Sequence, residues 1–144
     1  GLKTGGVQDP LQLVKRIREA VGPNIDLMAD VHGPPWLTVP DAIRLGKALE
    51  EYDLFFYEDP VAPENIENIA KVASPVDVPI AAGERHATIY GVRELIEREI
   101  VDVIQPDTGR QIATSTVVLQ NDHPRVIEAA VQNGGHHRHV LRVF

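Results

Sequence analysis

Apolar runs of strand length alternate with longer amphipathic stretches through the first 105 or so residues of the chain. The short runs are rich in β-branched and aromatic residues, which favours strands, whereas the longer stretches repeat apolar residues three and four positions apart, which favours helices. The predicted strands are residues 1–4, 26–30, 54–57, 78–82 and 101–104. The predicted helices are residues 10–21, a helix that Thr38 caps and that reaches residue 49, and residues 64–74 and 90–99. Strict alternation of this kind predicts an α/β fold with a parallel sheet.

Acidic residues stand at the carboxyl ends of four successive predicted strands. They are Asp30, Glu58, Glu84 and Asp107, separated in turn by 28, 26 and 23 residues. Each separation is about the length of one strand, one helix and two short loops. A doubly wound sheet gathers its ligand-binding groups at one switch point, whereas a TIM barrel draws them from the ends of several strands. The pattern therefore predicts a (β/α)8 TIM barrel.

The predicted barrel is partial, because about five βα units are recognisable and a complete barrel takes about 250 residues. We assign residues 1–110 to a partial TIM-barrel catalytic domain and residues 111–144 to a divergent tail. Within the tail, residues 112–119 fit a helix or a strand, residues 124–132 fit a helix, and residues 134–139 match no barrel turn. We expect the incomplete sheet to expose two long apolar edges. The chain by itself should then be a marginally stable, catalytically incompetent fragment that associates through those edges.

The composition is that of an ordinary soluble globular protein, with 43% hydrophobic and 24% charged residues. Lys and Arg number 14 against 21 Asp and Glu, a net charge of −7, which disfavours binding to nucleic acid or to anionic membranes. The chain has no cysteine, which excludes disulfides, thiol nucleophiles and thiolate metal sites. Neither a signal-peptide pattern nor a membrane-spanning apolar run is present, so we expect a cytoplasmic protein.

Three carboxylates brought together from adjacent strand ends would repel one another, and a cation relieves that repulsion. Asp30, Glu58 and Glu84 offer only oxygen ligands, which suits a hard cation such as Mg2+ that keeps water or substrate in its remaining positions. The alternative is that these acids cap the following helices or stand in solvated loops. The regular spacing of the three favours the metal site.

Four motifs, in order and at matching spacing, resemble the barrel motifs of the enolase superfamily, in its mandelate racemase and muconate lactonizing enzyme branch. They are Met28-Ala29-Asp30-Val31-His32, Phe56-Tyr57-Glu58-Asp59-Pro60, Ala82-Gly83-Glu84-Arg85 and Ile104-Gln105-Pro106-Asp107. The resemblance covers residues 1 to about 110. It implies that Asp30, Glu58 and Glu84 are Mg2+ ligands, and its Asp-x-His form is most similar to the acid-sugar (galactonate-type) dehydratases of this branch.

The resemblance also implies acid and base residues. His32 would protonate the departing hydroxyl, although a loop histidine packed beside prolines is the alternative. Lys3 would be a base at the tip of the first strand, where relatives carry a Lys-x-Lys pair and this chain has one Lys. A solvated lysine at a strand end is the alternative there.

Asp107 resembles the acid that orients a basic histidine from the next strand. His136 and His137 lie near the expected position, but their Gly-rich surroundings lack the apolar strand. Arg85 would hold a substrate carboxylate or balance charge, and Asp59 is interpreted as a local structural acid.

The implied reaction is Mg2+-dependent dehydration of a sugar acid (an aldonate), through α-proton abstraction and a metal-stabilised enediolate. A racemase, epimerase or cycloisomerase would pass through the same intermediate, and these remain alternatives. We expect the partners to be a small-molecule sugar acid and, in the intact protein, further copies of the same chain.

Overall fold

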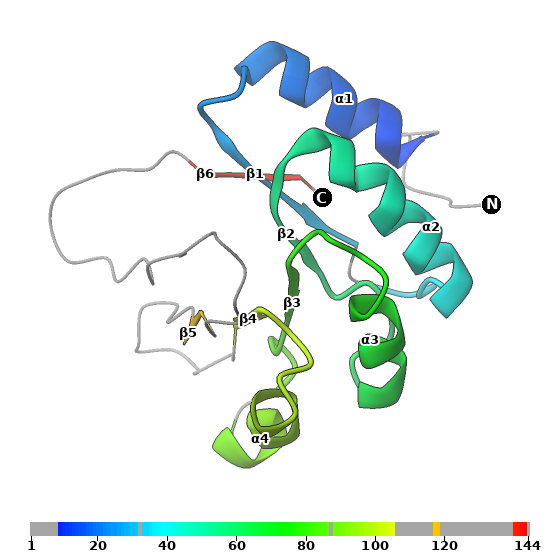
Figure 1. Ribbon diagram of the computed structural model, residues 1–144, viewed down its shortest axis with the longest axis vertical. Helices are drawn as coiled ribbons and strands as arrows, with labels where there is room; N and C mark the ends of the chain where they lie inside the picture. Colours follow the sequence, from blue (N-terminus) through cyan, green and yellow to red (C-terminus); the bar gives the residue numbers. More distant parts are fainter. Residues whose placement is uncertain (1–8, 32, 87, 106–116, 119–139, 144) are drawn as a thin grey trace, which may run out of the picture.

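The computed structural model describes residues 9–31, 33–86, 88–105, 117–118 and 140–143. In this part of the chain, strands and helices alternate as the hydrophobic pattern predicts (Figure 1). The helices are α1 (Pro10–Val21), α2 (Val39–Leu49), α3 (Ile66–Ala73) and α4 (Ile89–Glu97), with a short 3-10 helix, η1 (Glu50–Tyr52), after α2. The strands are β1 (Asp26–Asp30), β2 (Leu54–Glu58), β3 (Ile80–Ala82), β4 (Val103–Ile104), β5 (Val117–Val118) and β6 (Val140–Val143).

The four α-helices begin in the same way, with a short polar side chain that accepts a hydrogen bond from a backbone N–H of the first turn. The capping residues are Asp9, Thr38, Asn65 and Thr88. Such caps satisfy N–H groups that have no partner within the helix. They fix the start of each helix, so α3 begins two residues later than the apolar periodicity alone predicts.

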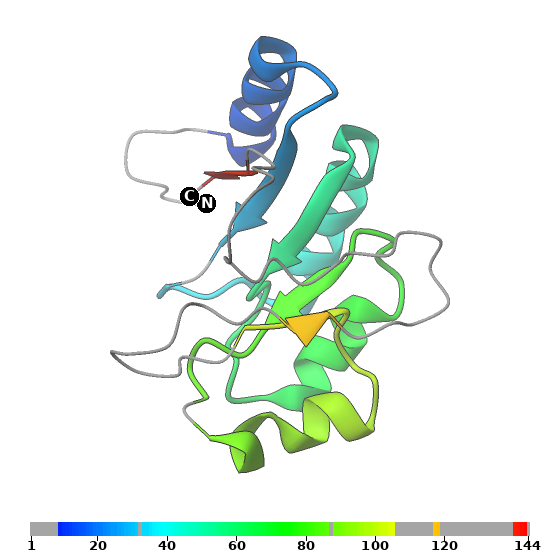
Figure 2. The same ribbon diagram turned by 90° about the vertical axis from the view of Figure 1, so that its left-hand side faces the viewer.

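The sheet has the order β5-β4-β3-β2-β1-β6, so β1 to β4 lie side by side in sequence order (Figure 2). These four strands are parallel, with Asp30 opposite Glu58, Glu58 opposite Ala81, and Ala82 opposite Ile104. All carboxyl ends of β1 to β4 therefore lie at one end of the sheet.

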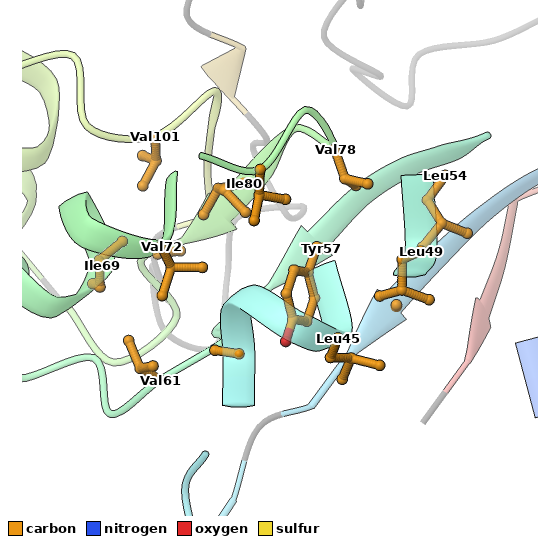
Figure 3. Close-up of a cluster of buried hydrophobic side chains, with 14 of the residues drawn as sticks. Leu45, Leu49, Leu54, Tyr57, Val61, Ile69, Val72, Val78, Ile80 and Val101 are labelled. Atoms are coloured by element: carbon orange, nitrogen blue, oxygen red, sulfur yellow. The ribbon is translucent and has the colours of Figure 1, made fainter. Parts of the chain in front are cut away.

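One face of the sheet is covered by the helices. All four α-helices contribute to a single buried cluster with strand residues such as Leu27, Tyr57 and Ile80. Figure 3 shows this cluster, with Tyr57 pointing from β2 toward α2. Parallel strands in sequence order with helices on one face are the winding of a barrel wall, whereas a doubly wound sheet carries helices on both faces. The predicted fold, part of a TIM barrel, is confirmed.

The opposite face carries a smaller apolar cluster built from Phe56, Ala81 and Val103, with Met28 and Phe55 packed against it. Alternate residues of a strand point to the same face. The final residues of β1 and β2, which are both acidic, therefore lie on the face away from the helices.

The amino end of the sheet is held by Arg18, near the end of α1. Its guanidinium donates to the backbone carbonyls of Gly22, Ile25, Tyr52 and Asp53, at distances from 2.6 to 3.0 Å. The first two carbonyls precede β1 and the last two precede β2. One side chain thereby joins α1 to the starts of both strands.

The starts of β3 and β4 are tied in a similar way. The Asp77 N–H donates to the Glu50 carboxylate at 2.9 Å, and the Asp102 carboxylate accepts from the Ile80 N–H at 2.8 Å. The Asp77 N–H and the ammonium group of Lys47, 2.8 Å away, lower the pKa of Glu50 below its usual value. These contacts use polar side chains to fix the loops that precede the strands.

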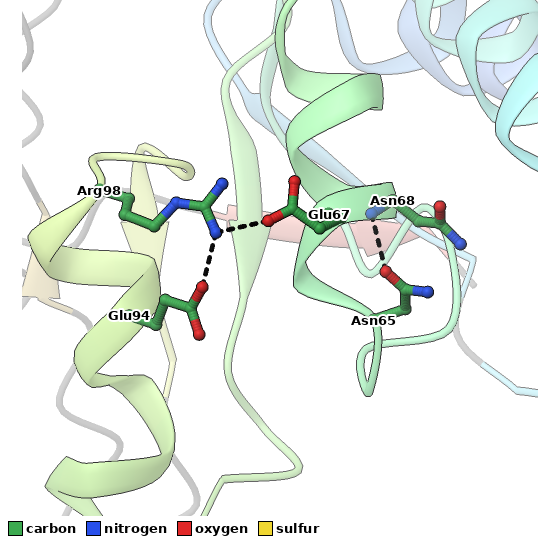
Figure 4. A network of polar contacts seen from close by, with 5 residues as sticks. All are labelled: Asn65, Glu67, Asn68, Glu94 and Arg98. Atoms are coloured by element: carbon green, nitrogen blue, oxygen red, sulfur yellow. Dashed lines mark hydrogen bonds and ion pairs between the residues drawn. The ribbon is translucent and has the colours of Figure 1, made fainter.

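Helices α3 and α4 are joined at the surface by Arg98, which lies just after α4 (Figure 4). Its guanidinium is 2.7 Å from the Glu67 carboxylate of α3 and 2.5 Å from the Glu94 carboxylate of α4. Hydrogen bonding to Arg98 lowers the pKa of Glu67. All three side chains are solvent-exposed, so the pairs orient the two helices without contributing much to stability.

The edges of the four-stranded sheet differ from the expectation. Two short segments of the tail pair with it: β6 lies parallel to β1, and β5 lies antiparallel to β4. The expected bare edge along the predicted strand at residues 101–104 is therefore wrong, because β5 pairs with β4, and the sheet ends instead on the short strands β5 and β6. The other expected edge, along residues 1–4, lies outside the described residues. β6 spans four residues, which carry too little hydrophobic pattern to predict a strand. The predicted strand at residues 1–4 and the predicted helix at residues 124–132 lie outside the described residues.

Candidate active site at the carboxyl end of the sheet

Asp30 and Glu58 form the base of the candidate site. Each is the last residue of its strand, and the two are opposite each other in the parallel register of β1 and β2. They are 6% and 2% exposed, so both carboxyl groups are almost fully buried. Burying two acids side by side is expensive unless positive charge or hydrogen-bond donors balance them. Residues of this type and burial at strand ends indicate a functional site more than a structural one.

Glu84 reaches the same end of the sheet from β3. It follows Ala82, the last residue of that strand, by two positions and is half-buried. Gly83 between them has φ of 128°, a left-handed conformation that side chains rarely adopt. The chain therefore turns sharply at the strand end, and Glu84 follows the turn directly.

The three predicted metal ligands thus stand at one end of the sheet, on three adjacent strands. Their oxygen-only donor set fits Mg2+. In the described part of the chain, no three His, Asp or Glu side chains are gathered closely enough to hold an ion. The fit rests on strand position, burial and ligand chemistry, and the ligand assignment of Asp30, Glu58 and Glu84 stays a prediction.

Arg85 lies in the loop between β3 and α4. Its Nε atom is 3.5 Å from a carboxylate oxygen of Glu64, in the loop between β2 and α3. Both side chains are more than half exposed, so solvent weakens the pair. The contact agrees with the charge-balancing alternative, and the role of Arg85 in holding a substrate carboxylate stays a prediction.

The predicted acid and base residues Lys3, His32 and Asp107 lie outside the described residues, as do His136 and His137. Their roles stay predictions. Asp59, the neighbour of Glu58, is 1% exposed and has φ of 42°, and its N–H donates to the Ala81 carbonyl at 3.0 Å.

Two further polar residues near the carboxyl end were not singled out from the sequence. The Nε2 atoms of His86 and Gln105 are buried and have no hydrogen-bond partner among the described residues. Strand alternation places Gln105 on the same face as Val103, which packs with Phe56. The sequence does not show that its nitrogen is buried.

Comparison with known proteins identifies the family. Residues 2–115 match the family described as Enolase C-terminal domain-like. The chain is 37% identical over 110 residues to a D-xylonate dehydratase of Haloferax volcanii, which covers 76% of this chain and 26% of that protein. It is 43% identical over 89 residues to a D-galactonate dehydratase family member, RspA, of Cellvibrio japonicus, covering 62% of this chain and 22% of that protein.

A third relative has a different name. It is a D-galactarolactone cycloisomerase of Agrobacterium fabrum, 36% identical over 103 residues, with 71% of this chain and 26% of that protein covered. The chain spans about a quarter of the length of these curated relatives.

Solved structures agree on the fold. A member of the enolase superfamily from Salmonella Typhimurium superposes with a TM-score of 0.63 at 39% identity, covering 67% of this chain and 24% of that one. A mandelate racemase/muconate lactonizing enzyme-like protein from Rubrobacter xylanophilus gives 0.63 at 34% identity, covering 70% and 27%. An enolase from Bradyrhizobium, complexed with magnesium and mandelic acid, gives 0.62 at 33% identity, covering 69% and 28%. The chain therefore belongs to the enolase superfamily, in its mandelate racemase and muconate lactonizing enzyme branch.

Proposed function

We propose that the intact protein is a Mg2+-dependent dehydratase of a sugar acid such as an aldonate. The observation that carries the proposal is the pair of buried carboxyl groups, Asp30 and Glu58, in register at the carboxyl ends of β1 and β2. Glu84 follows the adjacent strand. The dehydratase names of the relatives from Haloferax volcanii and Cellvibrio japonicus support the class of reaction.

The metal would be held by Asp30, Glu58 and Glu84. A proton next to a carboxylate is very weakly acidic, because its removal places a second negative charge on the carboxylate oxygens. Bound Mg2+ would stabilise that charge where it develops. The burial of Asp30 and Glu58 keeps water away from their side of the site, which strengthens such electrostatic stabilisation.

The remaining steps fall to the acid and base residues. Lys3, or a histidine oriented by Asp107, would remove the α-proton. His32, two residues after Asp30, would donate a proton to the β-hydroxyl as it leaves as water. The enol product then takes the keto form, so that the products are a keto-deoxy acid and one water molecule. Arg85 would hold a carboxylate of the substrate in place of the Glu64 carboxylate that it contacts in this structure.

A screen of the intact protein against a library of acid sugars tests the proposal. We expect a keto-deoxy acid, detected by mass spectrometry as loss of one water, and we expect chelation of Mg2+ to abolish its formation. Glu58→Gln should abolish turnover, whereas Glu51→Gln, an exposed acid in η1, should leave it unchanged. An epimerised product that retains its water would overturn dehydration.

A cycloisomerase is the second candidate, because one relative carries that name at 36% identity. It would use the same α-proton abstraction but close or open a ring without loss of water. Lactones of sugar acids in the same library distinguish the two: isomerisation of a lactone without loss of water would favour the cycloisomerase.

A further inference from the structure

The side-chain nitrogen of Gln105 is buried, and it has no hydrogen-bond partner among the described residues. Buried donors in folded proteins almost always have a partner. A buried amide group is also a poor choice for filling space, since an apolar side chain of the same length fills it without a desolvation penalty. The location of Gln105 indicates what the amide is for.

Gln105 directly follows β4 and lies at the carboxyl end of the sheet. Strand alternation places it on the same face as Val103, and therefore on the face of the sheet that carries Asp30 and Glu58. Its N–H donates to the Ala82 carbonyl at 3.1 Å, which continues the β3–β4 pairing by one step. Opposite Gln105 is Gly83, which directly follows β3 and precedes Glu84.

Gly83 is held directly against the backbone of Gln105. A Cβ atom on Gly83 would lie 3.2 Å from the Gln105 nitrogen and 3.4 Å from its carbonyl carbon. The positive φ of Gly83, 128°, excludes a side chain for a second reason. The turn that presents Glu84 therefore packs against the residue whose side-chain donor is buried without a partner.

We propose that Gln105 and Gly83 are positioning residues for Glu84. Gly83 allows the backbone of the Glu84 turn to approach β4, and the Gln105 amide donates a hydrogen bond to the Glu84 carboxylate when that carboxylate binds Mg2+. A donor on a ligand carboxylate fixes its orientation and leaves its other oxygen for the metal. The inference rests on the proposed function, because it takes Glu84 as a Mg2+ ligand.

The central test is Gln105→Met, which keeps the length of the side chain and removes the donor. Mg2+ affinity of the intact protein is measured by isothermal titration calorimetry with the metal alone, and Tm is measured in parallel. We expect Mg2+ binding to weaken by about 10- to 100-fold, the usual effect of removing a partner of a metal ligand. Tm should stay within a few degrees. Gln12→Met, the same change on an exposed position of α1, is the control and should alter neither quantity.

Gly83→Ala is the second variant. The added methyl group must push the Glu84 turn away from β4, so Mg2+ affinity should fall in the same direction. Gly83→Ala is more disruptive than Gln105→Met. If Gly83→Ala does not fold, the Mg2+ affinity of Gln105→Met alone decides the test.

The outcomes separate the inference from the proposed function. In one outcome, the intact protein binds Mg2+, and Glu84→Gln weakens this binding whereas Gln105→Met leaves it unchanged. The metal site then stands, and the positioning role of Gln105 is overturned. A loss of affinity in Gln105→Met that comes with a matching loss of Tm assigns Gln105 a structural role and also overturns it. If the unmodified protein does not bind Mg2+, the proposed function falls and the inference falls with it.

Discussion

At Gly46, helix α2 lies against its neighbours with no room for a side chain. A Cβ atom there would lie 2.8 Å from both methyl carbons of Val76, which is 7% exposed. Gly46→Ala should therefore lower the free energy of unfolding by up to about 2 kcal/mol, because overpacking of about 1–3 kcal/mol outweighs the gain in helix propensity of about 1 kcal/mol. Urea unfolding of the two proteins measures the difference.

The control for Gly46→Ala is Val76→Ala, alone and combined with it. Removing the valine methyl groups makes room for the new methyl group, so the double variant should lose less than the sum of the two single variants. If the changes in the free energy of unfolding of the two single variants simply add in the double variant, the two positions are not in contact and the predicted clash is absent.

Individual residues differ in how far the sequence reveals them. Asp30, Glu58 and Glu84 could be singled out because each acid follows an apolar run, and parallel strands share one end of a sheet. Gly83 and Gln105 could not, because their importance depends on φ at one position and on burial of one nitrogen atom. Neither property follows from residue spacing.

Single side chains hold the amino ends of the strands by hydrogen bonds to the backbone. Among the side chains that do so in the described residues, Arg18 makes the most such bonds. Arg18→Lys should lower the free energy of unfolding by about 1.5–3 kcal/mol, because an ammonium group cannot reach the four carbonyls that the guanidinium contacts. Arg16→Lys, on an exposed position of the same helix, is the matched control and should change stability by less than about 0.5 kcal/mol. Equal effects of the two substitutions, measured by thermal unfolding, would contradict the structural role of Arg18.

Element types and their order could be predicted because the apolar periods of helix and strand are distinct, and α1 (Pro10–Val21) even matches its predicted ends. Strand lengths were less certain. β3 is limited to Ile80–Ala82, shorter than predicted, since Pro79 has no N–H to donate to a ladder. The contacts of Arg18 were invisible in the sequence, because its partners are backbone carbonyls up to 35 residues away.

The whole sheet includes two strands from the tail, and β6 pairs with β1 along four residues. Deleting residues 140–144 should remove this pairing and lower the free energy of unfolding by about 0.5–1.5 kcal/mol for each backbone hydrogen bond that is lost. Amide hydrogen exchange in β1 should become faster, and analytical ultracentrifugation should detect association through the uncovered edge. The N–H of Val31 donates to Glu58 of β2, so strand alternation turns the N–H of Met28 toward β6. Unchanged exchange at Met28 would contradict the pairing.

At the scale of the molecule, the barrel winding could be predicted from alternation and from the spacing of the acids. The pairing of residues 140–143 with β1 could not, because more than a hundred residues separate the two segments and four residues carry little pattern. The assignment of residues 111–144 to a separate tail stays a prediction.

The distribution of contacts between the two ends of the sheet has a consequence for how such a chain can diversify. The side-chain ties of Arg18, Glu50 and Asp102 all lie before the strands, whereas Asp30, Glu58 and Glu84 lie at or after their ends. Sequence change in the loops after the strands can therefore alter the carboxyl end of the sheet while the contacts that hold the amino ends of the strands remain intact. A library randomised at Glu64 and Arg85, which are exposed in the loops after β2 and β3, should retain folded members at a higher frequency than one randomised at Arg18 and Glu50, so the carboxyl end of the sheet can change without a loss of the scaffold.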